Sequence, residues 1–305
     1  MSSWQLYWRM TRPGFLSITV VACLIGMASA AACGCGFDAL KGAATVVLAC
    51  LAHAGANVLN DYHDARNGAD EANQHGMFPF TGGSRLIQQG QVSIEDTRRW
   101  AMTLLGLTAI GGLLLALHSH GGLLVIGLLG VGLAWAYSAP PLALMTRGLG
   151  ELTVAGCWWL VVVGADFVQR GQWFVIPTYV GAGFALLVAN ILLINGVPDA
   201  PSDASVGKRT LATRLSPGQL AGLYALVVVL AHAWLAIGVW WLIPPTPTLW
   251  ALLTLPLGLR AAWSLWQHTQ GQSNRLRPAI TLTILTANLH GVALAVGLLL
   301  PRWWF

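Results

Sequence analysis

The sequence predicts an all-α, polytopic membrane protein in which nine transmembrane helices form one bundle, and two observations lead to this prediction. Hydrophobic residues make up 56% of the 305 residues and charged residues only 9%, whereas a soluble domain carries about 25% charged residues. Apolar stretches of about 20 residues, long enough to cross the hydrocarbon core as helices, recur from Phe15 to the C-terminus. We therefore expect lipid to surround most of the chain.

The expected spans follow one another closely, so residues 1–305 are expected to form a single domain. Two connections, 63–99 and 198–216, are long and polar, whereas most others are short turns rich in Gly, Pro and His. The expected helical ranges are 15–36, 39–62, 100–118, 121–138, 149–168, 173–197, 217–242, 247–266 and 279–300.

The basic residues predict the orientation of this bundle in the membrane. With nine spans, only Lys41, Arg170 and Arg302 of the 16 basic residues fall on the side opposite the N-terminus. Basic residues concentrate on the cytoplasmic side of membrane proteins. We therefore expect a multi-pass protein of the cell inner membrane, with the N-terminus, both long loops and an active site facing the cytoplasm. The scattered charges form no continuous basic face, so nucleic acid is not an expected partner.

The second expected span ends in four polar residues with helical spacing. Positions i, i+3, i+4 and i+7 share one face of a helix. Polar groups within a lipid-bounded helix usually face an interior cavity, although Asp and Asn are also ordinary at a solvated helix end. Carboxylate oxygens suit Mg²⁺, which shares its coordination shell with water and substrate phosphates. The four residues are Asn57, Asn60, Asp61 and Asp64.

The sixth expected span ends in carboxylates on the same side of the membrane. Asn195, Asp199 and Asp203 are four positions apart, but Pro198 and Pro201 leave open whether the helix persists that far. Acidic groups gathered at one face repel one another unless a cation lies between them. The two clusters are therefore expected to be facing halves of a divalent metal site.

Basic residues near these clusters are candidates for binding phosphate oxygens. Lys208 and Arg209 follow the second cluster, and Arg66 and Arg85 lie in the first long loop. The sequence leaves open the alternative that these residues serve membrane orientation alone.

These motifs resemble the UbiA superfamily of intramembrane prenyltransferases, over nearly the whole chain. Either acidic motif alone would be a weak signal, but together they are specific. Within the superfamily, Thr81–Arg85 and Arg147–Glu151 look closest to the 1,4-dihydroxy-2-naphthoate prenyltransferases of menaquinone biosynthesis. The residues that carry the broader resemblance are Asn60-Asp61-Tyr62-x-Asp64, Tyr137-Ser138-Ala139-Pro140-Pro141, and Asp199-x-x-x-Asp203-x-x-x-Gly207-Lys208-Arg209.

The resemblance implies Mg²⁺-dependent transfer of a polyprenyl group from its diphosphate to an aromatic acceptor within the membrane lipid. It implies that Asp61 and Asp64 hold one Mg²⁺ and that Asp199 and Asp203 hold a second, so these four residues are the expected catalytic and metal-binding residues. The expected substrate-binding residues are Asn57, Asn60, Arg66, Arg85, Lys208 and Arg209.

Several alternatives remain open at this stage. The acceptor is expected to be 1,4-dihydroxy-2-naphthoate or a related quinone precursor, with 4-hydroxybenzoate and homogentisate as alternatives. His53, His63 and Glu151 are candidates for contacting or deprotonating it. Such His residues more often only hydrogen-bond to their neighbours, and Glu151 has the alternative of pairing with Arg147. A secondary transporter is the main alternative of another class, because intramembrane acids also couple ions to solutes.

Overall fold

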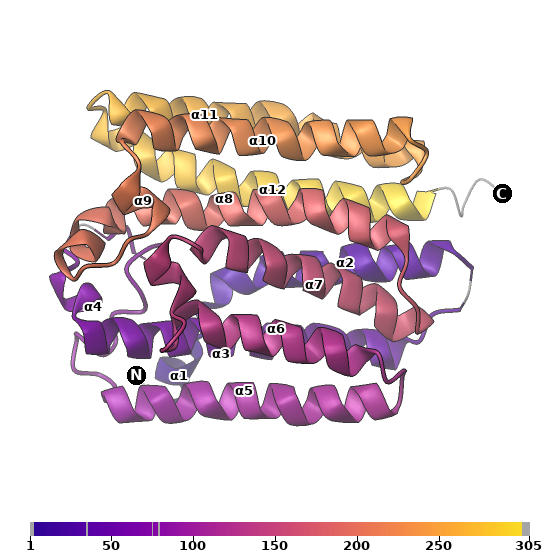
Figure 1. Ribbon diagram of the computed structural model, residues 1–305, viewed down its shortest axis with the longest axis horizontal. Coiled ribbons are helices and arrows are strands. Elements are labelled where there is room, and N and C mark those ends of the chain that lie inside the picture. The colour runs from indigo at the N-terminus through magenta and orange to yellow at the C-terminus, as the bar shows by residue number, and fades with distance from the viewer. Residues whose placement is uncertain (1–2, 35, 75, 79, 301–305) are drawn as a thin grey trace.

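The computed structural model describes residues 3–34, 36–74, 76–78 and 80–300, and within these ranges it contains helices and no strands. The long helices lie side by side along one direction, with the short helices α4 and α9 at one end (Figure 1). The elements are α1 (Ser3–Met10), η1 (Pro13–Phe15), α2 (Leu16–Ala32), α3 (Ala39–Asn67), α4 (Ala69–Ala72), α5 (Ile94–Leu117), α6 (Leu123–Ser138), η2 (Leu144–Arg147), α7 (Gly150–Arg170), α8 (Val175–Ser205), α9 (Leu211–Arg214), α10 (Pro217–Trp240), η3 (Thr246–Thr254), α11 (Leu255–Thr269), η4 (Ser273–Arg275) and α12 (Leu276–Leu299).

The structure confirms an all-helical membrane protein. Among the described residues, seven helical segments are long and apolar enough to cross a membrane. Helix α6, in the expected range 121–138, has 16 residues, and the expected range 247–266 divides into η3 and α11. Large apolar side chains such as Ile110 and Leu128 are exposed on the outside of the bundle, as lipid-facing side chains are.

Local sequence signals set the ends of helix α3. The Asp38 carboxylate accepts hydrogen bonds from the Leu40 and Lys41 N–H groups, both at 3.0 Å, and so caps the first turn. Gly68 ends the helix at φ 83°, a left-handed conformation that glycine adopts without steric cost. The helix therefore continues past the expected end at residue 62, and the whole first acidic motif is helical.

Helix α8 also exceeds its expected range, which ended at residue 197. It continues to Ser205 with Pro198 and Pro201 inside it. Proline interrupts the backbone hydrogen bonds of a helix, but hydrogen bonds from Asn73 and Gly82 to Asp199 hold this segment. The expected end was wrong because local propensity was outweighed by these tertiary contacts.

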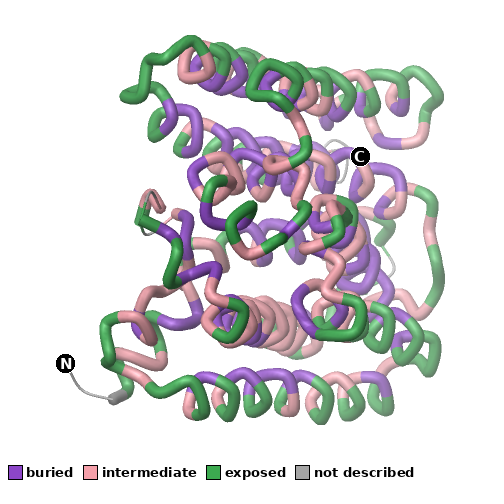
Figure 2. Tube along the Cα trace, turned by 60° about the vertical axis from the view of Figure 1, so that its left-hand side comes forward, coloured by how far each residue is buried: buried purple, intermediate pink, exposed green. Residues whose placement is uncertain are grey.

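The core lies between helices that are far apart in sequence. Helix α2 packs against α7 and α12, and α3 packs against α5. Ile25, Val162, Phe184 and Leu294 belong to the largest buried cluster, which joins α2, α7, α8 and α12. Buried segments occupy the middle of the bundle, and exposed residues face outward on the outer helices (Figure 2).

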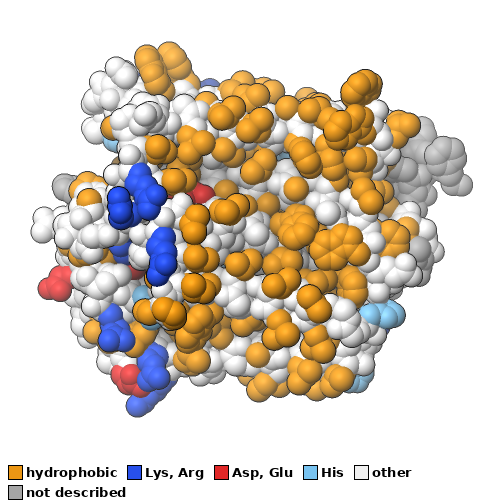
Figure 3. All heavy atoms as spheres, in the orientation of Figure 1, with side chains coloured by type: hydrophobic (Ala, Val, Ile, Leu, Met, Phe, Trp, Pro, Cys, Tyr) orange, Lys and Arg blue, Asp and Glu red, His pale blue; other side chains and the backbone are white. Residues whose placement is uncertain are grey.

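Charged side chains gather at one end of the molecule, whereas apolar side chains cover most of its length (Figure 3). This is the end at which α3 ends, α5 begins and α9 lies (Figure 1). The two long polar connections therefore meet there.

Candidate active site

A cavity of about 670 Å³ lies between α2, α3, α5, α6, α7 and α8. Most of its lining is apolar, including side chains such as Leu113, Ile126 and Val161. Its other lining residues include several charged and amide side chains from the ends of α3 and α8 and the adjoining loops. These are Arg12, Asn57, Asn60, Asp64, Asp70, Asn73, Asn195, Asp199, Asp203 and Lys208.

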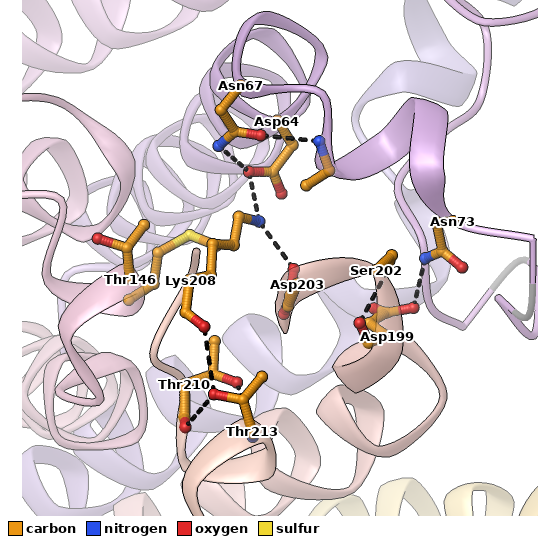
Figure 4. A network of polar contacts seen from close by, with 12 residues as sticks. Asp64, Asn67, Asn73, Thr146, Asp199, Ser202, Asp203, Lys208, Thr210 and Thr213 are labelled. Carbon is orange, nitrogen blue, oxygen red and sulfur yellow. Dashed lines mark hydrogen bonds and ion pairs between the residues drawn. The ribbon is translucent and has the colours of Figure 1, made fainter. Parts of the chain in front are cut away.

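Lys208 links the two acidic motifs. Its Nζ lies 2.7 Å from Asp64 Oδ1 and 3.1 Å from Asp203 Oδ1, so carboxylates from α3 and α8 meet at one ammonium group (Figure 4). Burial alone would lower the pKa of Lys208, but the two carboxylates raise it above its ordinary value. Lys208 is therefore a buried cation held in place by both half-sites.

Asp61 is the most deeply buried carboxylate of the first motif, at 2% exposure. It forms an ion pair with Arg12 and accepts a hydrogen bond of 3.0 Å from the Ser84 N–H group. Arg12 is one of the residues that line the cavity, whereas Asp61 is not. Arg12 had no predicted site role; its place three positions before Phe15, where the first apolar segment begins, was the available signal.

Asp199 receives the first long connection. Asn73 Nδ2 donates to its Oδ1 at 2.7 Å, and the Gly82 N–H group donates to its Oδ2 at 3.2 Å. In the same segment of α8, Ser202 Oγ donates to the Asp199 carbonyl at 2.8 Å. Asn73 and Gly82 therefore both contact the end of α8 and help to hold it helical beyond Pro198.

Asp70 is a further member of the acidic group; it follows the first motif in the sequence but was not among the predicted site residues. It is 5% exposed, and burial together with the Asp64 and Asp61 charges raises its pKa to about 8. A Cβ atom on Gly83 would lie 3.0 Å from Asp70 Oδ2 and 3.2 Å from Asp61 Oδ1. The glycine therefore allows the backbone to approach two carboxylates that lie on either side of it.

The two asparagines expected to bind substrate lie on the cavity-facing side of α3. Asn60 Nδ2 donates to Asp64 Oδ2 at 3.1 Å, and Asn57 Nδ2 donates to the Thr11 carbonyl at 3.1 Å. Both residues line the cavity. The predicted stripe of amides and carboxylates is thus present on one helix, with Asp61 at its buried edge.

Among the four basic residues expected to bind substrate, Lys208 lines the cavity and the other three do not. Arg66 donates to the Tyr62 hydroxyl at 3.1 Å on the surface. Arg85 donates to the Asp70 carbonyl and stacks over the Phe78 ring at 5.3 Å. Arg209 is exposed, and its backbone N–H group donates to the Thr146 carbonyl.

The donor chemistry at this end of the cavity suits magnesium, although the carboxylates are not arranged as a finished metal site. Within the described ranges, no three His, Cys, Asp or Glu side chains are grouped to hold a metal ion, and Lys208 lies between Asp64 and Asp203. Five carboxylates approach one another here, and Mg²⁺ needs only one or two of them beside water and phosphate oxygens. The residues present therefore fit the ion. The five are Asp61, Asp64, Asp70, Asp199 and Asp203.

The fold and this site define an integral membrane protein with an apolar cavity whose charged end suits a metal and an anion. The chain belongs to the UbiA prenyltransferase family, which matches residues 16–301, and it is a prenyltransferase.

Two relatives have the same name, 1,4-dihydroxy-2-naphthoate octaprenyltransferase. The protein of Mycobacterium tuberculosis is 31% identical over 221 residues, which cover 68% of each chain. That of Escherichia coli is 27% identical over an alignment of 315 residues, covering 99% of this chain and 98% of the relative. The structure of a UbiA homologue from Archaeoglobus fulgidus bound to DMAPP and Mg²⁺ covers 95% of this chain and 99% of its own, at a TM-score of 0.63 and 14% identity. The last likeness supports the fold.

Proposed function

We propose that the protein transfers a polyprenyl group from polyprenyl diphosphate to an aromatic acceptor, with Mg²⁺ as cofactor. The observation that carries this proposal is the cavity, because acidic side chains and a buried lysine adjoin a long apolar wall. A polyprenyl diphosphate has the same division into a charged group and an apolar chain. The solved homologue that holds DMAPP and Mg²⁺ supports the choice of ligand and ion.

Each part of the charged end has a proposed role. Asp61 and Asp64 bind one Mg²⁺, and Asp199 and Asp203 bind a second. Lys208 contacts the diphosphate, and Asn57 and Asn60 support the site from α3. Arg12, which lines the cavity beside Asp61, is a second phosphate contact and takes the place that the sequence suggested for Arg66 and Arg209.

The reaction begins with cleavage of the bond between the allylic carbon and the diphosphate oxygen. Bound Mg²⁺ supplies electrostatic stabilisation of the departing diphosphate. Lys208 adds positive charge at the same place. The apolar wall keeps water from the allylic carbon while it has cationic character, so the aromatic ring is the nucleophile that reaches it.

We further propose nine membrane crossings with the charged end facing the cytoplasm. Helix α6 and the pair η3 and α11 complete the crossings that begin with the seven longer segments. The distribution of lysine and arginine supports this orientation, because these residues concentrate at the end that holds the site.

The proposed acceptor is 1,4-dihydroxy-2-naphthoate. Relatives named for this substrate align over most or nearly all of the chain. The test is incubation of purified protein with labelled polyprenyl diphosphates, Mg²⁺ and, in parallel, dihydroxynaphthoate, 4-hydroxybenzoate and homogentisate. We expect a prenylated naphthalene product that requires Mg²⁺. Product from another acceptor alone would contradict the acceptor, and no product from any pair would contradict the reaction.

The metal assignment predicts loss of turnover when either half-site is broken. We expect Asp61→Ala and Asp199→Ala to lower kcat at least ~100-fold, because stabilisation of the leaving group is usually a large part of catalysis. Glu95→Ala is the matched control, since Glu95 is 51% exposed and pairs with Arg98 on α5. Thermal unfolding in detergent checks that the bundle is intact. Near-normal rates in both aspartate variants would refute the assignment.

A further inference from the structure

Among the described residues, three polar side chains that have no hydrogen bond with another residue line the cavity beside the carboxylates. They come from three different helices: Tyr137 from α6, Glu151 from α7 and Asn195 from α8. In the part of the chain that the structure describes, Asn195 Oδ1 is a buried atom without a hydrogen-bond donor. Buried polar atoms are nearly always paired, so this atom indicates a ligand that donates to it.

Glu151 contrasts with the four aspartates that are proposed to bind Mg²⁺. Asp61, Asp64 and Asp203 each have a basic partner, and Asp199 accepts two hydrogen bonds. The described residues provide Glu151 with no ion pair and no hydrogen bond from another residue. Its alternative partner, Arg147, instead donates to the Pro141 carbonyl at 2.6 Å.

Glu151 lies in the first turn of α7, where the helix dipole favours a negative charge. That position explains why a carboxylate is tolerated there, but not why the side chain faces the cavity. Tyr137, Glu151 and Asp64 all line this cavity, so the three groups border the same space. That space adjoins the proposed diphosphate site.

We propose that Tyr137, Glu151 and Asn195 form the aromatic-acceptor subsite, and that Glu151 is the catalytic base for one acceptor hydroxyl. This inference rests on the proposed function and deepens it. Glu151 and Asn195 Oδ1 are both hydrogen-bond acceptors, so together they fit a ring that carries two hydroxyl donors. The subsite therefore selects a dihydroxy acceptor over one with a single hydroxyl group.

In the proposed step, the phenolic proton moves to a Glu151 carboxylate oxygen. The O–H electron pair becomes the second bond of a ring carbonyl, and a ring π pair forms the new bond to the allylic carbon. The bond between that carbon and the diphosphate oxygen breaks, and its electron pair leaves with the diphosphate. Glu151 ends the step neutral, and the prenylated ring is a keto tautomer.

His53 is the rival base, and its position argues against it. Its Nδ1 lies 2.8 Å from Thr19 Oγ1 and its ring meets the edge of Trp158. It precedes Asn60 by seven residues on α3, which places it about 10 Å deeper in the bundle. Glu151, by contrast, is at the charged end of α7.

The experiment compares Glu151→Gln with wild-type enzyme, with Glu95→Gln as the matched control. We expect kcat for prenyl transfer to fall by about 10²–10⁴-fold, the usual contribution of a positioned base. Binding of a non-reacting prenyl thiolodiphosphate with Mg²⁺ should be unchanged. Across acceptors of increasing phenol acidity, the difference in kcat between variant and wild type should shrink, which a structural role would not produce.

A second variant tests selection of the dihydroxy ring. Asn195→Leu should raise KM for the dihydroxy acceptor about tenfold, as expected for one lost hydrogen bond, and leave KM for its monomethyl ether unchanged. Wild-type kcat in Glu151→Gln, or equal loss of analogue binding and transfer, would overturn the role of Glu151. An unchanged KM ratio in Asn195→Leu would overturn the subsite. If wild-type enzyme prenylates no acceptor, the proposed function itself fails.

Discussion

Replacing Lys208 with methionine removes the positive charge that lies between Asp64 and Asp203. The three side chains are 4%, 13% and 11% exposed, so their charges are largely shielded from water. Removing one partner of a buried ion pair costs about 3–5 kcal/mol. We expect about 3 kcal/mol, the lower end of that range, because the Asn60 and Asn67 amides still donate to Asp64.

The assay is reversible unfolding of the purified protein in detergent, with EDTA or with Mg²⁺. A loss of about 3 kcal/mol raises the unfolding constant about a hundredfold in EDTA. Mg²⁺ should close most of this gap, because the two ions proposed to bind Asp64 and Asp203 would neutralise the carboxylates that the ammonium group neutralises in the wild type. Arg209→Met is the matched control, since Arg209 is the exposed neighbour of Lys208.

Two results would refute this reasoning. If Lys208→Met unfolds like wild type in EDTA, the ion pairs do not stabilise the folded chain. If Mg²⁺ stabilises Lys208→Met and Arg209→Met equally, the ions do not bind to Asp64 and Asp203. The double variant Lys208→Met with Asp203→Asn separates these cases, because it removes the repulsion and should recover part of the lost stability without metal.

Two further predictions concern the acidic group and the apolar wall. Without Mg²⁺, the free energy of unfolding should fall as the pH rises from about 4 to 8. The pKa of Asp70 is raised to about 8 in the folded state, so the folded chain keeps a proton there that the unfolded chain releases near pH 4. Asp70→Asn should flatten this dependence of the unfolding midpoint on pH; an unchanged slope would contradict it. Gly130 lines the cavity and has open space at its Cβ position, so Gly130→Leu should lower kcat/KM for long prenyl diphosphates about tenfold relative to short ones. Competition between a long and a short prenyl diphosphate measures this ratio. Gly132→Leu, on the exposed side of α6, is the control. An equal ratio in both variants would disprove the role of Gly130.

The fold was predictable because hydropathy alone specifies which segments leave water. The bounds were less predictable at α8, where local rules about proline gave an end near residue 197. Asn73 and Asp199 are 126 positions apart, and their hydrogen bond depends on the tertiary fold. No local pattern in the sequence predicts that contact, so the persistence of α8 could not be derived beforehand.

The site was predictable in composition but only partly in geometry. Helical spacing placed Asn57, Asn60 and Asp64 on one face, and the structure has them on the cavity side of α3. Asp70 follows a glycine that breaks the helix, so periodicity could not assign it to that face. Its convergence with Asp61 around Gly83 depends on how the loop returns.

The basic residues show that closeness in sequence is a poor guide to which cations are buried beside the carboxylates. Lys208 and Arg209 are neighbours outside any regular helix, yet Lys208 is buried between carboxylates while Arg209 is exposed. An arginine on the surface remains hydrated at no cost, whereas a buried lysine requires the compensating charges of Asp64 and Asp203. The charge of Arg12 is likewise compensated by an ion pair with Asp61, which lies 49 positions away in the sequence. Burial beside a carboxylate, rather than distance from a motif, is therefore the basis for proposing Lys208 and Arg12 as the diphosphate contacts.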